Sequence, residues 1–473
     1  MKQSGLLRLL LISTNDASIY NRLRARKRNF VGSNNKFITA IAYATGTQPY
    51  SVAVIDVNND NKPDIVTANT GASTVSVLLN TGNGTFSAQT TYATDSSPYS
   101  VAVIDVNGDN KPDIVTANSG ASTVSVLLNI GNGTFSAQAT YATGSSPYSV
   151  AVVDVNSDNK PDIVTANSGA NTVSVLLNTG TGTFSTQTTY ATDSSPRSVA
   201  VADVNNDNKP DIVTANYITS TVSVLLNKGN GTFSAQITYA TGNGPVSVSV
   251  VDVNNDSKPD IVTANYAAGT ASVLLNTGNG AFSAQATYAT GTQVNSVVVV
   301  DVNNDSKPDI VTANYGASNV SVLLNIGNGA FSAQTTYATG NGPVSVAVVD
   351  VNNDSKPDIV TANYGASNVS VLLNTGNGTF SAQTTYATGS SPYSVAVIDV
   401  NNDNKPDIVT ANVDTNTASV LLSTGTGTFC CRTTYVTGSA PFSLVVVDVN
   451  DDNRPDIVTA NSGASSVGVS AQC

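Results

Sequence analysis

The chain has 473 residues and a formal charge of −12, and all 32 of its acidic residues are aspartate. Histidine, glutamate and tryptophan are absent. Because histidine and glutamate are the commonest general acids and bases, this composition predicts a protein that is not an enzyme. No stretch is long and apolar enough to predict a transmembrane helix.

The leader, residues 1–35, lies outside the periodic pattern of the remaining chain. Leu6–Ile12 resembles the apolar core of a secretory signal after Lys2, but Arg8 interrupts it and no clear cleavage site follows. Arg22–Arg28 is basic and predicts a solvated linker that could touch anionic lipid. Two interpretations are kept, a weak export signal and a flexible basic leader.

Residues 36–473 form one repeated region. The stretch DVNNDNKPDIVTAN at Asp56–Asn69 returns every 49 residues until DVNDDNRPDIVTAN at Asp448–Asn461, which gives nine copies. A fixed period of this length is typical of solenoids and propellers, in which each unit buries its apolar faces against its neighbours. We therefore expect one domain over 36–473 instead of several unrelated ones.

Each unit predicts four strands and no helix. In one copy these are the β-branched run Ser100–Val106, then Asp113–Asn118, Thr123–Asn129 and Phe135–Thr143. A glycine-rich turn, IGNGTF, separates the last two. Four antiparallel strands in a 49-residue period indicate a propeller blade. A parallel β-solenoid is the rival, but its rungs are shorter.

The two ends of the repeat region complement each other. The last unit stops at Ser466–Cys473, after a third strand, whereas Lys36–Gly46 matches a fourth strand. We predict an all-β propeller of nine blades in which the N-terminal strand completes the last blade and leaves no free sheet edge. Propellers typically have four to eight blades, so a smaller ring with extra blades and an open spiral remain as alternatives.

The acidic loop of each unit predicts a cation site. Positions 1, 3, 5 and 9 are Asp, Asn, Asp and Asp, and position 7 offers a backbone carbonyl. These hard oxygen donors suit Ca²⁺, with an affinity of about 10⁻⁴–10⁻³ M, whereas zinc and copper would prefer nitrogen or sulfur. Up to nine Ca²⁺ ions would change the formal charge from −12 to +6.

The predicted metal ligands, with lysine and arginine acting through the backbone carbonyl, are Asp56, Asn58, Asp60, Lys62, Asp64, Asp105, Asn107, Asp109, Lys111, Asp113, Asp154, Asn156, Asp158, Lys160, Asp162, Asp203, Asn205, Asp207, Lys209, Asp211, Asp252, Asn254, Asp256, Lys258, Asp260, Asp301, Asn303, Asp305, Lys307, Asp309, Asp350, Asn352, Asp354, Lys356, Asp358, Asp399, Asn401, Asp403, Lys405, Asp407, Asp448, Asn450, Asp452, Arg454 and Asp456. The alternative is that nine Asx-rich turns simply join strands. Position 6 is the weak point, because it is Asn or Ser, as in Asn61 and Ser257, where a left-handed backbone favours glycine.

The order of strand, loop, strand and GNGTF turn resembles the FG-GAP/VCBS repeats, the class that includes the integrin α-chain propeller. The resemblance covers about residues 36–473. It implies a β-propeller with calcium in the loop between the first two strands of a blade, an extracellular setting, and roles in adhesion or ligand binding. Asn at position 3 and Asn or Ser at position 6 depart from the family pattern. The chain offers no leg region or inserted domain, which excludes a full integrin.

These observations predict a non-enzymatic, calcium-binding propeller, extracellular or at the cell surface, that acts as a monomeric ring. Its expected partner is a protein or carbohydrate ligand at the blade-edge loops, with no nucleic acid. The alternative is a passive structural scaffold of a surface or matrix. A polysaccharide-acting enzyme is disfavoured, because no acid–base pair stands apart from the loops.

Several other residues invite a role. Tyrosines recur in the fourth strands and in some turns, where they predict packing between blades or sugar binding. Sequons such as Asn83-Gly-Thr85 lie at hairpin tips and predict sites for glycans, whereas those of Asn255, Asn304 and Asn353 lie inside the loops. The residues that break the repetition, where a unique partner would be recognised, include Arg197, Ile218 and Lys228.

The three cysteines lie near the C-terminus. A Cys430–Cys473 bridge between neighbouring units is conceivable, but incidental substitutions that leave a free thiol are the simpler interpretation of Cys430, Cys431 and Cys473.

Overall fold

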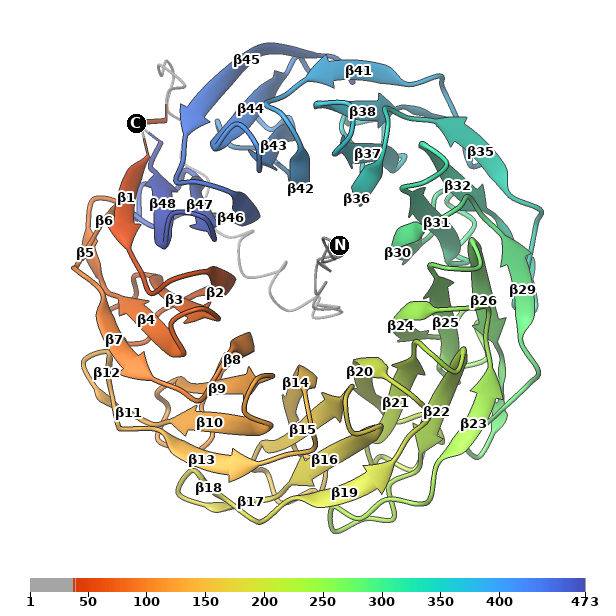
Figure 1. Ribbon diagram of the computed structural model, residues 1–473. Helices are drawn as coiled ribbons and strands as arrows, with labels where there is room; N and C mark the ends of the chain where they lie inside the picture. Colours follow the sequence, from red (N-terminus) through yellow and green to blue (C-terminus); the bar gives the residue numbers. More distant parts are fainter. Residues whose placement is uncertain (1–36, 39, 473) are drawn as a thin grey trace, which may run out of the picture.

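The repeat region closes into a ring of nine blades. The computed structural model describes residues 37–38 and 40–472. Each blade is a four-stranded antiparallel sheet, and the blades follow one another around a centre (Figure 1). The predicted nine-bladed all-β propeller is therefore confirmed. Residues 1–36, with the predicted leader, lie outside the described residues. In the described part no helix is present that is long and apolar enough to cross a membrane.

Blade 1 begins at the first strand after the N-terminal segment, and blade 9 ends the chain. The first strands line the inner edge of the ring (Figure 1). They are β2 (Pro49–Ile55), β8 (Pro98–Ile104), β14 (Pro147–Val153), β20 (Pro196–Ala202), β24 (Pro245–Val251), β30 (Val294–Val300), β36 (Pro343–Val349), β42 (Pro392–Ile398) and β46 (Pro441–Val447). The second strands are β3 (Asp64–Asn69), β9 (Asp113–Asn118), β15 (Asp162–Asn167), β21 (Asp211–Asn216), β25 (Asp260–Asn265), β31 (Asp309–Asn314), β37 (Asp358–Asn363), β43 (Asp407–Asn412) and β47 (Asp456–Asn461).

The third strands are β4 (Thr74–Leu78), β10 (Thr123–Leu127), β16 (Thr172–Leu176), β22 (Thr221–Leu225), β26 (Thr270–Leu274), β32 (Asn319–Leu323), β38 (Asn368–Leu372), β44 (Thr417–Ser423) and β48 (Ser466–Ser470). The fourth strands, at the outer edge, are β7 (Thr90–Ala93), β13 (Ala139–Ala142), β19 (Thr188–Ala191), β23 (Ile237–Ala240), β29 (Ala286–Ala289), β35 (Thr335–Ala338), β41 (Thr384–Ala387), β45 (Phe429–Val436) and, for blade 9, β1 (Ile41–Ala44).

Short two-stranded hairpins connect the third and fourth strands of six blades. They are β5 (Asn80–Gly82) with β6 (Thr85–Phe86), β11 (Asn129–Gly131) with β12 (Thr134–Phe135), β17 (Asn178–Gly180) with β18 (Thr183–Phe184), β27 (Asn276–Gly278) with β28 (Ala281–Phe282), β33 (Asn325–Gly327) with β34 (Ala330–Phe331), and β39 (Asn374–Gly376) with β40 (Thr379–Phe380).

Three strands of blade 2 have boundaries that differ from the sequence prediction. The strand expected over Thr123–Asn129 ends as β10 at Leu127, because Asn129 begins the small hairpin strand β11. The strand expected over Ser100–Val106 is β8, Pro98–Ile104, because Val106 already donates its backbone N–H to a loop aspartate. The strand expected over Phe135–Thr143 shortens to β13, because Phe135 pairs with Asn129 in the small hairpin. Local β-propensity could not distinguish one long strand from a hairpin followed by a short strand.

The N-terminal strand completes the last blade, as predicted. β1 pairs antiparallel with β48, and Ile41 lies opposite Val469 (Figure 1). Phe37 continues the repeat register, because its ring packs edge-on against Tyr435 at a centroid distance of 5.2 Å. Its backbone N–H donates to the hydroxyl of that tyrosine. The sheet edge of β48 is thereby covered.

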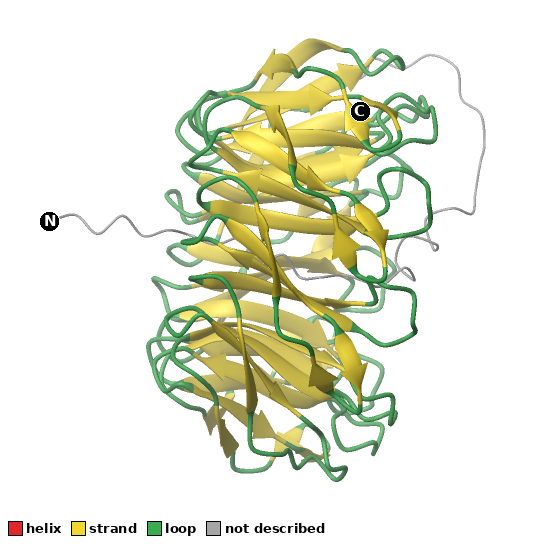
Figure 2. Cartoon of the chain, turned by 90° about the vertical axis from the view of Figure 1, so that its right-hand side faces the viewer, coloured by secondary structure: helices red, strands yellow, loops and turns green. Residues whose placement is uncertain are grey.

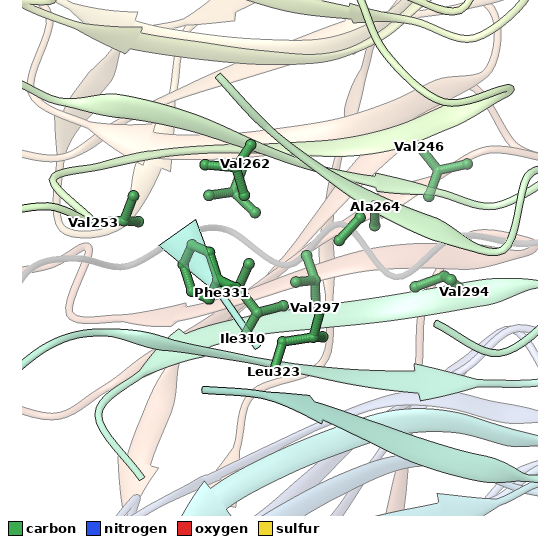
Figure 3. Packing of buried hydrophobic residues seen from close by; sticks show 11 residues of the cluster. Val246, Val253, Val262, Ala264, Val294, Val297, Ile310, Leu323 and Phe331 are labelled. Carbon is green, nitrogen blue, oxygen red and sulfur yellow. The ribbon is translucent and has the colours of Figure 1, made fainter. Parts of the chain in front are cut away.

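Apolar side chains bury one face of each blade against the preceding blade and the other face against the following blade. The second strand DIVTAN is fully buried in all nine blades. Between blades 5 and 6, Val262 and Ala264 of β25 face Val297, Ile310 and Leu323 of the next blade (Figure 3). Equivalent clusters join each of the remaining eight pairs of neighbouring blades, including blades 9 and 1. Burial of apolar area at about 25 cal/mol per Å² makes these junctions the main source of stability.

Aromatic pairs lock the outer part of each junction. Tyr92 of a fourth strand packs edge-on against Phe135 of the next blade at 5.5 Å, and its hydroxyl accepts the backbone N–H of that residue at 3.1 Å. The same pair recurs around the ring. Fourth-strand tyrosines therefore pack between blades, which confirms that prediction.

Polar side chains inside the blades are satisfied by one another. Thr67 donates to Asn69, Asn69 donates to Ser76, and Ser76 donates to Gln89, all within blade 1. Buried polar groups cost stability unless they are hydrogen-bonded, so this ladder explains the invariant Thr and Asn of each DIVTAN stretch.

The ring has two faces, which Figure 2 shows edge-on. The loop face carries the nine acidic loops between first and second strands, together with the glycine-rich tips. The turn face carries the connections into each first strand and the turns after each second strand, which are hydrogen-bonded to each other, as in Gly71 to Thr47.

Candidate metal loops of the loop face

The backbone of every acidic loop is left-handed at two positions. Position 6 has φ between 62° and 65° in all nine loops, whether it is Asn61 or Ser257. Position 4 is also left-handed, as in Asn59 and Gly108. The left-handed backbone that the sequence analysis considered at position 6 is therefore present with both Asn and Ser. Serine at position 6 adopts it despite its Cβ, at a cost of about 1 kcal/mol that asparagine partly avoids.

The aspartate at position 1 organises the loop from within. Asp56 accepts the backbone N–H of Asn61 at 2.7 Å and that of Asn58 at 3.1 Å. The 2.7 Å bond recurs in every loop. The amide oxygen of Asn58 at position 3 accepts the N–H of Asp60. Positions 1 and 3 thus face the interior of the loop.

The aspartate at position 9 is a fully buried structural group. Asp64 is 0% exposed and accepts two backbone N–H groups, that of Val57 at 2.8 Å and that of Asn80 at 2.7 Å. The equivalent aspartates do the same in the other eight blades. This carboxylate therefore ties the loop to the end of the third strand. The sequence analysis treated position 9 only as a metal ligand and missed this structural role.

Position 5 lies at the surface and pairs with position 7. The Asp60 carboxylate contacts the Lys62 amine at 3.3 Å and also accepts the lysine's backbone N–H. Seven further loops repeat this ion pair at 2.9–3.7 Å. Exposed pairs of this kind contribute about 0–1 kcal/mol, so the lysine holds the carboxylate only weakly.

The donor chemistry of each loop fits a hard divalent cation. Three carboxylates and one amide oxygen are present, and no nitrogen or sulfur ligand competes. Burial raises the pKa of Asp64, and the charges of Asp56 and Asp60 raise it further. Within the described part of the chain, no group of three or more His, Cys, Asp or Glu side chains is positioned to hold a metal. The position-5 carboxylates face their lysines instead.

Burial followed by the neighbouring charges raises the pKa of Asp64 to about 6, against the hydrogen bonds that lower it. Six equivalents reach about 6, and Asp407 and Asp456 reach about 7. The folded carboxyls therefore bind protons more tightly than unfolded ones, whose pKa is about 3.9. The stabilisation of the folded state that comes from protonating these carboxyls is fully present below about pH 4 and is lost as the pH rises through 6 to 7.

In EDTA, we thus expect the melting temperature to increase as the pH is lowered from 8 to 5. Differential scanning calorimetry over this range measures the effect. A melting temperature that falls steadily toward pH 5 would contradict the burial of nine carboxylates.

Neighbouring loops are hydrogen-bonded to one another. Asn255 at position 4 donates its side-chain amide to the carbonyl of Ser306 in the next loop, at 2.9 Å. Five further junctions repeat this bond at 2.6–3.3 Å. Gly108, Ser157 and Asp451 occupy position 4 in the remaining loops and carry no side-chain amide. The sequons at Asn255, Asn304 and Asn353 are therefore engaged in the loop ring.

One asparagine that the sequence analysis missed joins each blade to the preceding loop. Asn276 donates its side-chain amide to the carbonyls of Pro259 and of Val204, which lies at position 2 of the previous loop. The bond to the previous loop measures 2.5–2.7 Å at seven junctions, including that of Asn80 to Val449 between blades 1 and 9. This asparagine ends the recurring LLN triplet, which was the signal in the sequence that could have revealed it.

Two junctions lack this asparagine. Ser423 replaces it in blade 8, and Gln472 replaces it in blade 9, where the Gln472 side-chain oxygen is buried without a partner in the described part of the chain.

We expect Asn276→Ser to lower the unfolding free energy by about 1–3 kcal/mol, because the buried Val204 carbonyl loses its donor. The reverse change, Ser423→Asn, should raise stability by supplying a donor to Val351. Urea unfolding of both variants measures the pair. Equal destabilisation by both changes would show that the hydrogen bond from this asparagine to the previous loop does not stabilise the junction between blades.

The remaining sequence predictions have these outcomes. Cys430 and Cys431 are free and exposed, and Cys473 lies outside the described residues, so a bridge to it stays a prediction. Asn83 is exposed at its hairpin tip, which leaves it accessible to a glycan.

Known proteins share limited similarity with this chain. A search of curated proteins finds no match. One similar solved structure is an Agrocybe aegerita lectin described as recognising non-reducing terminal N-acetylglucosamine. It has 18% identity and a TM-score of 0.41, and the match covers 74% of this chain and 94% of that chain. Another is the V. cholerae biofilm matrix protein Bap1, at 14% identity, 93% and 91% coverage, and a TM-score of 0.48. At these values neither indicates a ligand for this chain.

The family itself is shown by the repeats. The model of the FG-GAP-like repeat matches eight overlapping segments of 61 residues. Each segment begins at a loop aspartate, the first at Asp56 and the last at Asp399, and the last segment ends at residue 459. Together the segments span residues 56–459, which include all nine acidic loops and all six small hairpins. The chain therefore belongs to the FG-GAP-like repeat family.

Proposed function

We propose that the protein is a non-enzymatic, extracellular, calcium-binding propeller that presents a ligand-binding face. One observation carries the calcium part. Nine loops repeat three carboxylates and an amide oxygen at the same positions and in one backbone conformation, with left-handed residues such as Asn61, and positions 1 and 3 face the loop interior. Carboxylates held this close repel one another, and a divalent cation relieves the repulsion.

The chemistry suggests which residues would hold the ion. Positions 1 and 3 already face the loop interior, and position 9 borders it. Position 5 would have to exchange its lysine for the ion, which costs little because that pair is exposed. The position-7 carbonyl would supply a further oxygen. Bound calcium would give charge neutralisation and rigidity to the loop ring.

The inventory of side chains supports the proposal that the protein has no catalytic activity. The described carboxylates are almost all committed to the loops or hydrogen-bonded on the turn face, and the chain has no histidine. A rigid ring with a varied turn face suits recognition instead of turnover.

A binding screen tests the ligand part of the proposal. Purified protein in 5 mM calcium is applied to glycan and protein arrays, and the same arrays are probed in EDTA. We expect specific, calcium-dependent binding to at least one ligand class without turnover. Hydrolysis of a bound glycan, or no binding to any ligand on either array, would contradict it.

A further inference from the structure

One aromatic residue per blade reaches the inner rim of the turn face, although it comes from two different sequence positions. In blades 1, 2, 3, 8 and 9 it is the second residue of the first strand. In blades 4 to 7 it is the residue after the second strand, twenty positions later. The two sets are Tyr50, Tyr99, Tyr148, Tyr393 and Phe442, and then Tyr217, Tyr266, Tyr315 and Tyr364.

The exchange is complementary within each blade. Where the first strand supplies the aromatic ring, the residue after the second strand is Thr, Ser or Val. Where the turn supplies it, the first-strand residues are Arg197, Val246, Asn295 and Val344. In a chain of near-identical copies, these two rim positions therefore vary from blade to blade, where a ligand would meet the inner edge of the ring.

The first-strand aromatics contact each other across blades. The rings of Tyr50 and Tyr99 lie 4.4 Å apart and those of Tyr99 and Tyr148 4.6 Å apart, with hydroxyl–hydroxyl hydrogen bonds of 2.6 and 2.8 Å. Burial raises the pKa of Tyr50 to about 12, so that the hydroxyl stays protonated and can donate. Tyr364 and Tyr393, at 6.1 Å, connect the turn-borne arc to the strand-borne arc.

Arg197 occupies the other end of the strand-borne arc, one blade after Tyr148. Its guanidinium lies 3.7 Å from the ring centroid of Tyr217, which orients it by a cation–π contact. In the described residues it has no hydrogen-bond or ion-pair partner, and Asp193 nearby accepts the hydroxyl of Thr221 instead. A half-buried, oriented and unpaired guanidinium is suited to bind a carboxylate through two parallel hydrogen bonds.

No other basic residue of the described chain shares this rim. Eight lysines and Arg454 belong to the acidic loops, Lys228 lies at a tip of the loop face, and Arg432 donates to the Thr388 carbonyl on an outer strand. Positive charge on the turn face is thus confined to one blade.

We propose that the turn-face rim around Arg197 binds an acidic polysaccharide, with a uronate carboxylate on the guanidinium and sugar hydroxyls on the tyrosine hydroxyls. This inference rests on the proposed ligand-binding function. Hydroxyl and amide groups surround the site, including Ser220 and Asn243, which are hydrogen-bonded to each other. Of the large exposed apolar residues in the described chain, Ile218, 66% exposed, lies beside Tyr217, whereas Val436, 61% exposed, lies at the outer edge of the ring, at the end of β45. Protein partners usually need several apolar anchors, which favours a polysaccharide over a peptide.

The test compares a short oligogalacturonate with its methyl ester, which has the same sugars but no carboxylate charge. Isothermal titration in calcium should show that the ester binds at least about tenfold more weakly. The matched variant is Arg197→Tyr combined with Tyr217→Ser, because blades 2 and 3 carry these residues and fold with them. It should lose at least about tenfold in affinity with an unchanged melting temperature.

Equal binding of acid and ester, no binding of the acid, or full affinity in the double variant would overturn the inference. Equally tight binding of poly-glutamate at Arg197 would overturn it in favour of an acidic peptide. If the arrays reveal a different ligand that the double variant still binds, the proposed function stands and this inference alone fails. If no ligand of any class binds, the proposed function fails as well.

Discussion

Chelation of calcium is expected to lower the melting temperature by about 10 °C or more. At free calcium ten times the dissociation constant, each loop would contribute about 1.4 kcal/mol, or about 13 kcal/mol over nine loops. Because the entropy of unfolding grows with chain length, about 13 kcal/mol in a chain of 473 residues corresponds to a shift in melting temperature of about 10 °C or more. Thermal unfolding followed by circular dichroism, in 10 mM calcium and in EDTA, measures it.

The control distinguishes calcium in the loops from a general salt effect. Magnesium at equal ionic strength should protect much less, because it demands a stricter octahedral geometry. Replacing Asp252 and Asp256 by Asn in one loop should remove only about a ninth of the calcium effect. Identical melting curves with and without EDTA would refute a structural role for the ion.

Deletion of residues 36–46 should open the ring and cause self-association. The deletion removes β1, the edge-on contact of Phe37 with Tyr435, and that of Tyr43 with Phe86. The exposed edge of β48 then offers unpaired backbone groups to another chain. We expect dimers or larger species by light scattering and a melting temperature lower by several degrees.

Deletion of residues 1–35 is the matched control, because it leaves the closing strand in place. This variant should remain as monomeric and as stable as the full chain. If the longer deletion were equally monomeric and equally stable, closure by β1 would have no energetic role.

The sequence predicted the features that depend on local pattern. Blade number, the four strands of each blade and the closing role of Lys36–Gly46 followed from the period and the chain ends. The acidic loops were found because Asp and Asn recur at fixed positions, and the left-handed backbone at Asn61 agrees with that pattern.

Features that depend on distant contacts could not be predicted. Asn129 looks like the end of a strand, and its role appears only because Val57, 72 residues earlier, lies in the adjacent loop. Asp64 shares the spacing of a ligand, yet its burial and its two backbone donors are set by the third strand. The aromatic rim was hidden because Tyr50 and Tyr217 occupy different positions of the repeat.

Equilibrium dialysis against calcium tests the central proposal most directly, because it counts the ions bound by each chain. We expect binding that approaches nine ions per chain at millimolar free calcium, and eight when the carboxylates of one loop are replaced by amides. A chain that retains no calcium above the buffer level, with its blades folded, would show that these loops are hydrogen-bonded turns that hold no ion.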